Sequence, residues 1–307
     1  KKNRLWFLSW KKIFSRHLKE RGPYDYVFFA NFTSCVVGHK LSSEVLPPYS
    51  ITLHGDDIDY YFTIRKLKSL ILINKFKIID FFKNSKKVIC VSNFTKKKLL
   101  KVVPFNISCE VVHHGIEPKD LNLIRESALA LKKTMKQKIP KGKVILVYVS
   151  RLEPMKGQQQ LIKLLSRNKK LAKKTHTIFI GGGSQYKFLN KLAEESNISD
   201  QVTFTGEIPR DEVLKFISIA DILIFLSHHP RETFGLVILE GMLVKKPVIV
   251  RNHGGMIEAI EHNRNGYIID DNNLESRLTA LVNDRDLRKQ MGDEGRKLID
   301  QKFNSLN

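Results

Sequence analysis

The fold is decided by residues 227–241, which read Ser-His-His-Pro-Arg-Glu-Thr-Phe-Gly-Leu-Val-Ile-Leu-Glu-Gly. Residues 220–226 before this stretch are apolar and partly β-branched, a pattern that predicts a buried strand. Residues 236–244 after the loop are apolar enough for the first turns of a helix that packs on a sheet. Because the second half of the chain repeats this alternation of strand and helix, it indicates an α/β protein with a doubly wound sheet.

The loop within this stretch combines an anion-binding site with two acidic residues. Gly235 has no Cβ, so the backbone there can approach a ligand closely. The amides of Phe234, Gly235 and Leu236 are predicted to be donors of a helix N-terminus, where the helix dipole favours an anion. Glu232 and Glu240 flank the site, and their carboxylates repel phosphate but accept hydrogen bonds from sugar hydroxyls. A nucleotide-sugar, which contains both phosphates and hydroxyls, therefore fits the loop best.

The segment from Glu232 to Glu240 resembles the Glu-x7-Glu signature of the retaining nucleotide-sugar glycosyltransferases of family 4 (group 1). Further motifs follow the family's order, namely Ala220-Asp221, Lys246-Pro247 and Gly254-Gly255-x-x-Glu258. A Glu-x7-Glu pair alone is more often an exposed helix face, so the ordered set of motifs gives the match its specificity. The resemblance runs from about Tyr24 to the C-terminus. It implies the GT-B fold, with two Rossmann-like doubly wound domains that face each other across a cleft.

The length of 307 residues is enough for two domains, and a hydrophobic content of 42% permits sizeable cores. Pro140-Lys141-Gly142 is a turn signal, which predicts a boundary between residues 1–139 and residues 140–307. The resemblance implies an acceptor-side domain in the first range and a nucleotide-sugar-binding domain in the second. Family members begin with a strand and a Gly-rich turn that this sequence lacks, so the N-terminal domain is expected to be incomplete at its start.

The second range contributes further candidates for the donor site. Arg151 and Lys156 follow a predicted strand over residues 143–150, at the edge where open α/β sheets bind ligands. Cations preorganised at this edge can stabilise the charge that develops on a departing nucleoside diphosphate. The two residues resemble the family's Gly-Arg-x-Lys-Gly element. Three more donor-binding candidates come from the matched segments, namely Gly182 in a Gly-rich turn, Ile208 beside the base and Thr233 in the Glu-x7-Glu loop.

The first range contributes a candidate catalytic histidine. Residues 50–57, Ser-Ile-Thr-Leu-His-Gly-Asp-Asp, are predicted to form a strand that ends in a loop. They resemble the family's His-Gly-x-Asp element, in which the histidine lies near the donor sugar and the acid lies close to the acceptor. A lone histidine at a strand end is more often structural, and the motif is what favours His54 as catalytic. Asp56 and Asp57 are the acceptor-side candidates, with Asp57 at the family's acid position.

Positive charge is concentrated in the first half of the chain. The net charge is +22, and residues 1–140 hold 27 Lys and Arg against 11 Asp and Glu. This half is expected to meet an anionic partner, such as a phosphate-bearing acceptor or a membrane surface, unless the charge serves solubility alone. Residues 64–87 fit a core helix with a solvated lysine face better than a basic amphipathic helix on an anionic bilayer. A nucleic-acid partner is not expected, because no basic motif is interleaved with aromatic residues.

The cysteines and the apolar runs bear on the compartment. Cys35, Cys90 and Cys109 are odd in number and lack a C-x-x-C spacing, which indicates buried thiols rather than a disulfide framework or a metal site. No apolar run reaches about 18 residues, so no membrane-spanning segment is predicted. The expected location is the cytoplasm, with peripheral attachment to the inner face of the cell membrane as an option.

Together with the resemblance, these residues predict a retaining transfer of a hexosyl unit from a nucleotide-sugar, with UDP favoured, to a hydroxyl of a glycan or lipid-linked acceptor. The resemblance implies that the leaving phosphate helps to deprotonate the acceptor. It also implies that Arg151, Lys156 and the amides of residues 234–236 hold the diphosphate, while Glu232 binds the donor sugar and Glu240 the ribose. No metal and no cofactor beyond the donor are expected. Synthesis of a bacterial cell-envelope polysaccharide or lipopolysaccharide is the expected role.

Two other functions stay open at the level of the sequence. The first is a non-catalytic, truncated module that binds a nucleotide-sugar or an anionic surface. The missing N-terminal elements favour this interpretation. The second is a UDP-sugar epimerase of the same fold, which would release a free sugar without any acceptor.

Overall fold

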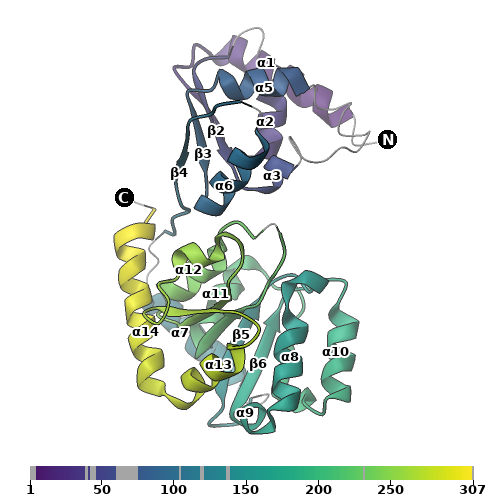
Figure 1. Ribbon diagram of the computed structural model, residues 1–307, viewed down its shortest axis with the longest axis vertical. Coiled ribbons are helices and arrows are strands. Elements are labelled where there is room, and N and C mark those ends of the chain that lie inside the picture. Colours follow the sequence, from purple (N-terminus) through teal and green to yellow (C-terminus); the bar gives the residue numbers. More distant parts are fainter. Residues whose placement is uncertain are drawn as a thin grey trace. The chain divides into compact units, whose positions relative to one another are not determined.

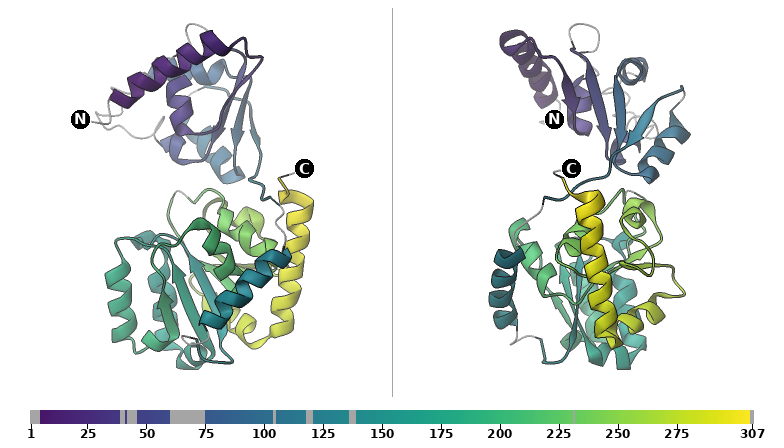
Figure 2. Two further views of the ribbon diagram at one scale, coloured as in Figure 1. Left: turned by 180° about the vertical axis from the view of Figure 1, so that it is seen from behind. Right: turned by 90° about the vertical axis from the view of Figure 1, so that its left-hand side faces the viewer.

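The computed structural model describes residues 5–38, 41, 46–59, 75–103, 105–117, 121–135, 139–230 and 232–305. The chain divides into two compact units, Lys1–His113 and His114–Asn307 (Figure 1). This division falls earlier than the predicted boundary between residues 139 and 140. Helix α7 (Leu121–Met135), which the prediction assigns to the first domain, packs on α11 (Arg210–Ile219) of the second unit, and it buries Ala128 and Met135 there (Figure 2). An amphipathic helix belongs to the core that covers its apolar face.

The first unit is built on a parallel sheet of four strands in the order β1-β2-β3-β4. The strands are β1 (Val27–Phe29), β2 (Tyr49–Leu53), β3 (Lys87–Cys90) and β4 (Cys109–Val111). The described helices are α1 (Leu5–Arg21), α2 (Phe32–Gly38), α3 (Asp56–Ile58), α5 (Lys75–Lys83) and α6 (Asn93–Val102). All residues of β2 are buried, as expected for a strand that is covered on both faces.

Helix α5, Lys75–Lys83, lies within the basic segment that the sequence marks at residues 64–87. Its Ile78, Phe81 and Phe82 are buried in the core of the first unit, whereas Lys83 is exposed. The side chains that the structure describes in α5 thus agree with a core helix that exposes Lys83 to solvent. Residues 64–74 lie outside the described residues.

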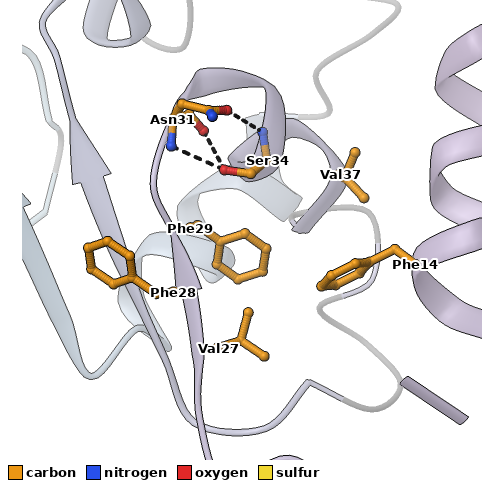
Figure 3. A pocket seen from close by; sticks show the side chains of 7 residues that line it. All are labelled: Phe14, Val27, Phe28, Phe29, Asn31, Ser34 and Val37. Atoms are coloured by element: carbon orange, nitrogen blue, oxygen red, sulfur yellow. Dashed lines mark hydrogen bonds between the residues drawn. The ribbon is translucent and has the colours of Figure 1, made fainter. Parts of the chain in front are cut away.

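A pocket of about 350 Å³ lies in the first unit, lined by residues of α1, β1 and α2 and by Asn31 just before α2 (Figure 3). Five of its seven lining residues are apolar, and the lining comprises Phe14, Val27, Phe28, Phe29, Asn31, Ser34 and Val37. The two polar members bond to each other, because Ser34 N donates to Asn31 Oδ1 at 2.9 Å and Asn31 N donates to Ser34 Oγ at 3.1 Å. The pocket therefore offers little to a sugar or a phosphate.

The second unit is built on a parallel sheet of six strands in the order β10-β9-β8-β5-β6-β7. The strands are β5 (Val144–Val149), β6 (Thr175–Ile180), β7 (Val202–Phe204), β8 (Ile222–Phe225), β9 (Val248–Arg251) and β10 (Gly266–Ile269). The chain runs outward from β5 to β6 and β7, and then returns to place β8 on the other side of β5. The carboxyl ends of β5 and β8 therefore form the switch point at which such sheets bind ligands.

Helices cover both faces of this sheet. Helices α7, α11 and α12 (Leu236–Leu243) contribute to one apolar core. The opposite core receives α8 (Gln158–Arg167), α9 (Lys169–Lys174), α10 (Tyr186–Glu195) and α13 (Leu274–Asn283). Helix α14 (Arg285–Leu298) runs beside α12, and α8 lies beside α10 (Figure 1). Both units are thus Rossmann-like, as the sequence predicts.

The cysteines and the absence of a predicted membrane-spanning segment can also be compared with the described residues. Cys35, Cys90 and Cys109 are free and buried, as predicted, and burial raises the pKa of Cys90 to about 12. Among the helices that the structure describes, none is both long and apolar enough to cross a bilayer.

Candidate active site

An ion pair between Lys156 and Glu232 lies at the switch point of the second unit. Lys156 ends the 3-10 helix η3 (Pro154–Lys156) after β5, and Glu232 lies in the loop that leads from β8 to α12. The Lys156 and Glu232 side chains are only 14% and 16% exposed. Ser227 Oγ donates a second hydrogen bond to the same Glu232 oxygen at 2.6 Å. The Glu232 carboxylate is therefore held in one orientation by two donors.

The buried hydroxyl of Tyr148 places Lys156 against the end of β8. Tyr148 lies in β5, is 1% exposed, and donates from its hydroxyl to the carbonyl of Lys156. The same hydroxyl accepts the amide of Leu226 at 2.7 Å. Burial raises the pKa of Tyr148, so the group stays a neutral donor and acceptor. The sequence reasoning missed Tyr148, although a tyrosine inside an apolar strand signals a buried hydroxyl that needs partners.

Gly157 is the single residue that connects η3 to α8. Its φ is +84°, and a Cβ at this position would lie 2.4 Å from the carbonyl oxygen of Leu226. Only glycine fits, because the backbone must both turn left-handed and touch the end of β8. This explains why a glycine follows Lys156 directly.

Arg151 follows the end of β5 and is exposed. The buried Gln158 stabilises the turn that contains Arg151. Its Nε2 donates to the carbonyl of Arg151 at 2.9 Å and to Ser150 Oγ at 2.7 Å. Within the part of the chain that the structure describes, no hydrogen bond or ion pair engages the Arg151 guanidinium. Arg151 is therefore a cation available to an anionic ligand at the same sheet edge as Lys156.

The glycine run around Gly182 packs against this turn. A Cβ on Gly181 would lie 2.2 Å from the carbonyl oxygen of Ser150, and one on Gly183 would lie 2.4 Å from that of Leu152. The carbonyl of Gly182 accepts the amide of Leu152 at 2.8 Å. Gly181 and Gly183 thus let the loop after β6 lie directly on the loop after β5, which supports the position of Arg151.

Helix α12 begins at Leu236, and Gly235 precedes it with a φ of +86°. The first amides of such a helix have no intrahelical acceptor, which makes them donors for a ligand. Phe234 is 1% exposed, with its ring 5.7 Å from Phe303, whereas Leu236 is 40% exposed and Thr233 is half-buried. The loop is thus anchored by Phe234 and reaches solvent at Leu236.

Gly254 and Gly255 hold the backbone of this loop from the side. The amide of Gly255 donates to the carbonyl of Glu232 at 2.9 Å. A Cβ on Gly254 would lie 2.1 Å from the same carbonyl oxygen. The close approach at Gly254 explains why a glycine stands at this position after β9.

Glu240 lies on α12 with its side chain 14% exposed, and it pairs with Arg210 at the start of α11. The distance between Arg210 Nη2 and Glu240 Oε1 is 2.5 Å. Ile208 is half-buried against the core beneath α11, two residues before Arg210. The sequence reasoning identified Glu240 and Ile208 but missed Arg210, which no local pattern distinguishes from an ordinary exposed arginine.

The first-unit candidates share one turn after β2. His54 Nε2 lies 2.8 Å from the carbonyl oxygen of Ala30, which links it to the end of β1. The Asp57 carboxylate is 1% exposed and accepts the amides of His54 and Gly55, the latter at 2.7 Å. Burial raises the pKa of Asp57, against the opposing effect of these amide bonds. Asp57 therefore caps the turn that carries His54, while the side chain of Asp56 lies outside the described residues.

Comparison with known sequences gives two family matches. The family described as Glycosyl transferases group 1 matches residues 131–298, and the one described as Glycosyltransferase Family 4 matches residues 1–120. An uncharacterized glycosyltransferase of Methanocaldococcus jannaschii is 30% identical over 275 residues, which cover 86% of this chain and 67% of that protein.

A second relative has a named activity. The GDP-mannose-dependent alpha-(1-6)-phosphatidylinositol monomannoside mannosyltransferase of Mycobacterium tuberculosis is 28% identical over 217 residues, 68% of this chain. The match spans only 56% of the length of that curated relative. Among solved structures, Anabaena HepE in complex with UDP superposes with a TM-score of 0.77 at 20% identity, covering 96% of this chain and 78% of that one.

Proposed function

The chain belongs to the group 1 glycosyl transferases, and from this premise we propose that it transfers a hexosyl unit from a nucleotide-sugar to an acceptor hydroxyl with retention at the anomeric carbon. The observation that carries the proposal is the clamped Glu232 carboxylate, held by Lys156 and Ser227 at the switch point of the sheet. A carboxylate fixed there can accept hydrogen bonds from donor-sugar hydroxyls. The adjacent cations can hold the phosphates.

Each donor-site residue has a role in this proposal. Arg151, Lys156 and the amides at the start of α12 bind the diphosphate, where a guanidinium can form two parallel bonds to phosphate oxygens. Glu232 binds the hydroxyls of the donor sugar, and Glu240 binds those of the ribose. His54 is kept as the catalytic candidate of the first unit.

The reaction needs no carboxylate nucleophile in this scheme. The bond between the anomeric carbon and the leaving phosphate oxygen breaks, and a bond to the acceptor oxygen forms on the same face. The acceptor proton passes to the leaving phosphate. Arg151 and Lys156 stabilise the negative charge that develops on the diphosphate, which is the task a divalent metal performs elsewhere. We therefore propose a metal-independent enzyme.

UDP is the first candidate for the donor nucleotide, and HepE was solved with UDP, although the mycobacterial relative is named for GDP-mannose. The proposed acceptor is a glycan or a lipid-linked glycan of a bacterial cell envelope. A peripheral place on the inner face of the cell membrane suits such an acceptor, and the excess of basic residues in the first 140 positions is consistent with it.

The test is a thermal shift assay with UDP, GDP, ADP and CMP, with and without EDTA, on the wild-type protein and on Glu240→Ala. One nucleotide should raise the melting temperature by roughly 5 °C or more at a concentration about a hundredfold above its Kd. The shift should persist in EDTA and disappear in Glu240→Ala. A matched control is Glu195→Ala, which removes an exposed carboxylate from α10 and should keep the full shift.

Other results would change the proposed function. If no nucleotide stabilises the protein, the non-catalytic module becomes the better description. If the protein releases UDP and a free sugar with equal rates in the presence and absence of glycan acceptors, the epimerase alternative is favoured. A shift that EDTA abolishes would replace the metal-independent scheme with a metal-assisted one.

A further inference from the structure

The ion pair between Arg210 and Glu240 joins two elements of the second unit. Arg210 is the first residue of α11 and Glu240 lies in the second turn of α12, thirty residues later. The Arg210 side chain is 72% exposed, whereas the Glu240 side chain is 14% exposed. Arg210 thus reaches from the surface to a carboxylate that is largely withdrawn from water.

Such a contact changes what the carboxylate can do. A carboxylate that is mostly buried loses hydration, and a charged hydrogen bond offsets part of that loss. The guanidinium is planar and rigid, so its bond to Oε1 also limits rotation of the carboxylate. A carboxylate has about four acceptor positions, which is more than a single bond from a guanidinium occupies.

We propose that Arg210 is a positioning residue for the donor nucleotide. It holds the Glu240 carboxylate in the orientation that accepts the ribose hydroxyls, and it thereby selects ribonucleotides over 2′-deoxyribonucleotides. This inference rests on the proposed function, because it assumes that Glu240 binds ribose. It adds a residue that none of the sequence motifs includes.

The same helix provides a matched control. Lys215 Nζ and Glu212 Oε1 on α11 are also 2.5 Å apart, with side chains 32% and 36% exposed. This pair is local, three residues apart on one helix, and it involves no residue of the candidate site. Lys215→Ala removes a cation from α11 without touching Glu240.

The experiment is calorimetric titration of UDP, GDP and their 2′-deoxy forms into the wild type, Arg210→Ala, Arg210→Lys and Lys215→Ala. For the nucleotide that the wild type binds, Arg210→Ala should raise Kd about tenfold or more, as expected for loss of a bond to a charged group. The affinity for the 2′-deoxy form should fall much less, because that form already lacks one hydroxyl that could donate a hydrogen bond to Glu240. Arg210→Lys should recover part of the affinity, and Lys215→Ala should match the wild type.

Steady-state kinetics provide a second measurement. Because Arg210 acts through Glu240 on the ribose, which does not react, Arg210→Ala should raise KM for the donor and leave kcat nearly unchanged. Circular dichroism would verify that each variant is folded. Arg210 is exposed at a helix start, so its removal should leave the core intact.

The outcomes separate the two hypotheses. If the wild type binds neither UDP nor GDP, the proposed function fails, and this inference fails with it. If the wild type binds one of them and Arg210→Ala binds it equally well, the inference is overturned while the proposed function stands. An equal loss for the ribose and 2′-deoxy forms would also overturn it, because Arg210 would then not act through the ribose hydroxyls.

Discussion

Burial decides which charged side chains of this protein are fixed in place. Lys156 and Glu232 are 14% and 16% exposed, and a third group, Ser227, shares their contact. Lys191 and Glu195 form a pair of the same residue types on α10, but at 3.6 Å with side chains 73% and 60% exposed. Exposed pairs of this kind contribute roughly 0–1 kcal/mol. Only the buried pair can therefore hold a defined geometry for a ligand.

At the residue scale, His176 should make stability depend on pH. His176 lies in β6, is 2% exposed, and its ring Nε2 is 2.9 Å from Thr203 Oγ1. Burial, helped by Lys143, lowers the pKa of His176 below its ordinary value near 6.5. The unfolded chain therefore binds a proton at higher pH than the folded one, so this contribution is complete above about pH 6.5 and declines as the pH falls.

The measurement is chemical unfolding between pH 5 and pH 8 for the wild type and His176→Gln. The wild type should lose up to about 1.4 kcal/mol per pH unit more than the variant below about pH 6.5. If the unfolding free energy of the wild type and of His176→Gln changes equally with pH, His176 is not the source of the pH dependence.

At the scale of elements, glycines set how closely the loops of the second unit approach one another. Gly157 and Gly142 both have positive φ, of +84° and +81°. A Cβ on Gly157 would meet Leu226 at 2.4 Å, whereas one on Gly142 would meet nothing within 4 Å. Alanine substitutions at the two positions therefore distinguish the free-energy cost of a left-handed backbone from the cost of a steric collision.

Gly142→Ala should therefore lower the free energy of unfolding by about 1 kcal/mol, the strain of a left-handed residue alone. Gly157→Ala should cost roughly 3 kcal/mol or more, because the colliding atom belongs to the backbone and cannot swing away. It should also weaken nucleotide binding, since η3 carries Lys156. If denaturant unfolding gives equal losses of unfolding free energy for the two variants, the backbone around residue 157 accommodates the added Cβ without a collision.

At the scale of the whole molecule, the two units have separate cores. The chain has two tryptophans, Trp6 and Trp10, and both belong to α1 in the first unit. Tryptophan fluorescence therefore reports on the first unit, while circular dichroism reports on both. The proposed donor-site residues that bind the nucleotide all lie in the second unit.

A saturating nucleotide should therefore raise the unfolding midpoint seen by circular dichroism and leave the midpoint seen by fluorescence unchanged. Binding stabilises only the unit whose folded form binds the ligand. Thermal scans with and without UDP, or with the nucleotide found in the thermal shift panel, would measure both midpoints. A parallel rise in both signals would mean that the units unfold as one cooperative block.

Much of the fold follows from local pattern. The apolar run before Ser227 forms β8, and Gly235 ends the loop so that α12 starts at Leu236, as the sequence predicts. These features depend on neighbouring residues only, through side-chain alternation and the φ that glycine permits. The same holds for the positions of Arg151 and Lys156, which follow a strand and therefore lie at its carboxyl end.

What the tertiary structure alone decided are the contacts between distant segments. Lys156 meets Glu232 across 76 residues, and Tyr148 meets Leu226 across 78, because the sheet places β8 beside β5. Helix α7 joins the second unit because its apolar face packs on α11, which no local signal shows. Strand order and helix packing depend on the whole set of buried surfaces, whereas the identity of each element depends on its own residues.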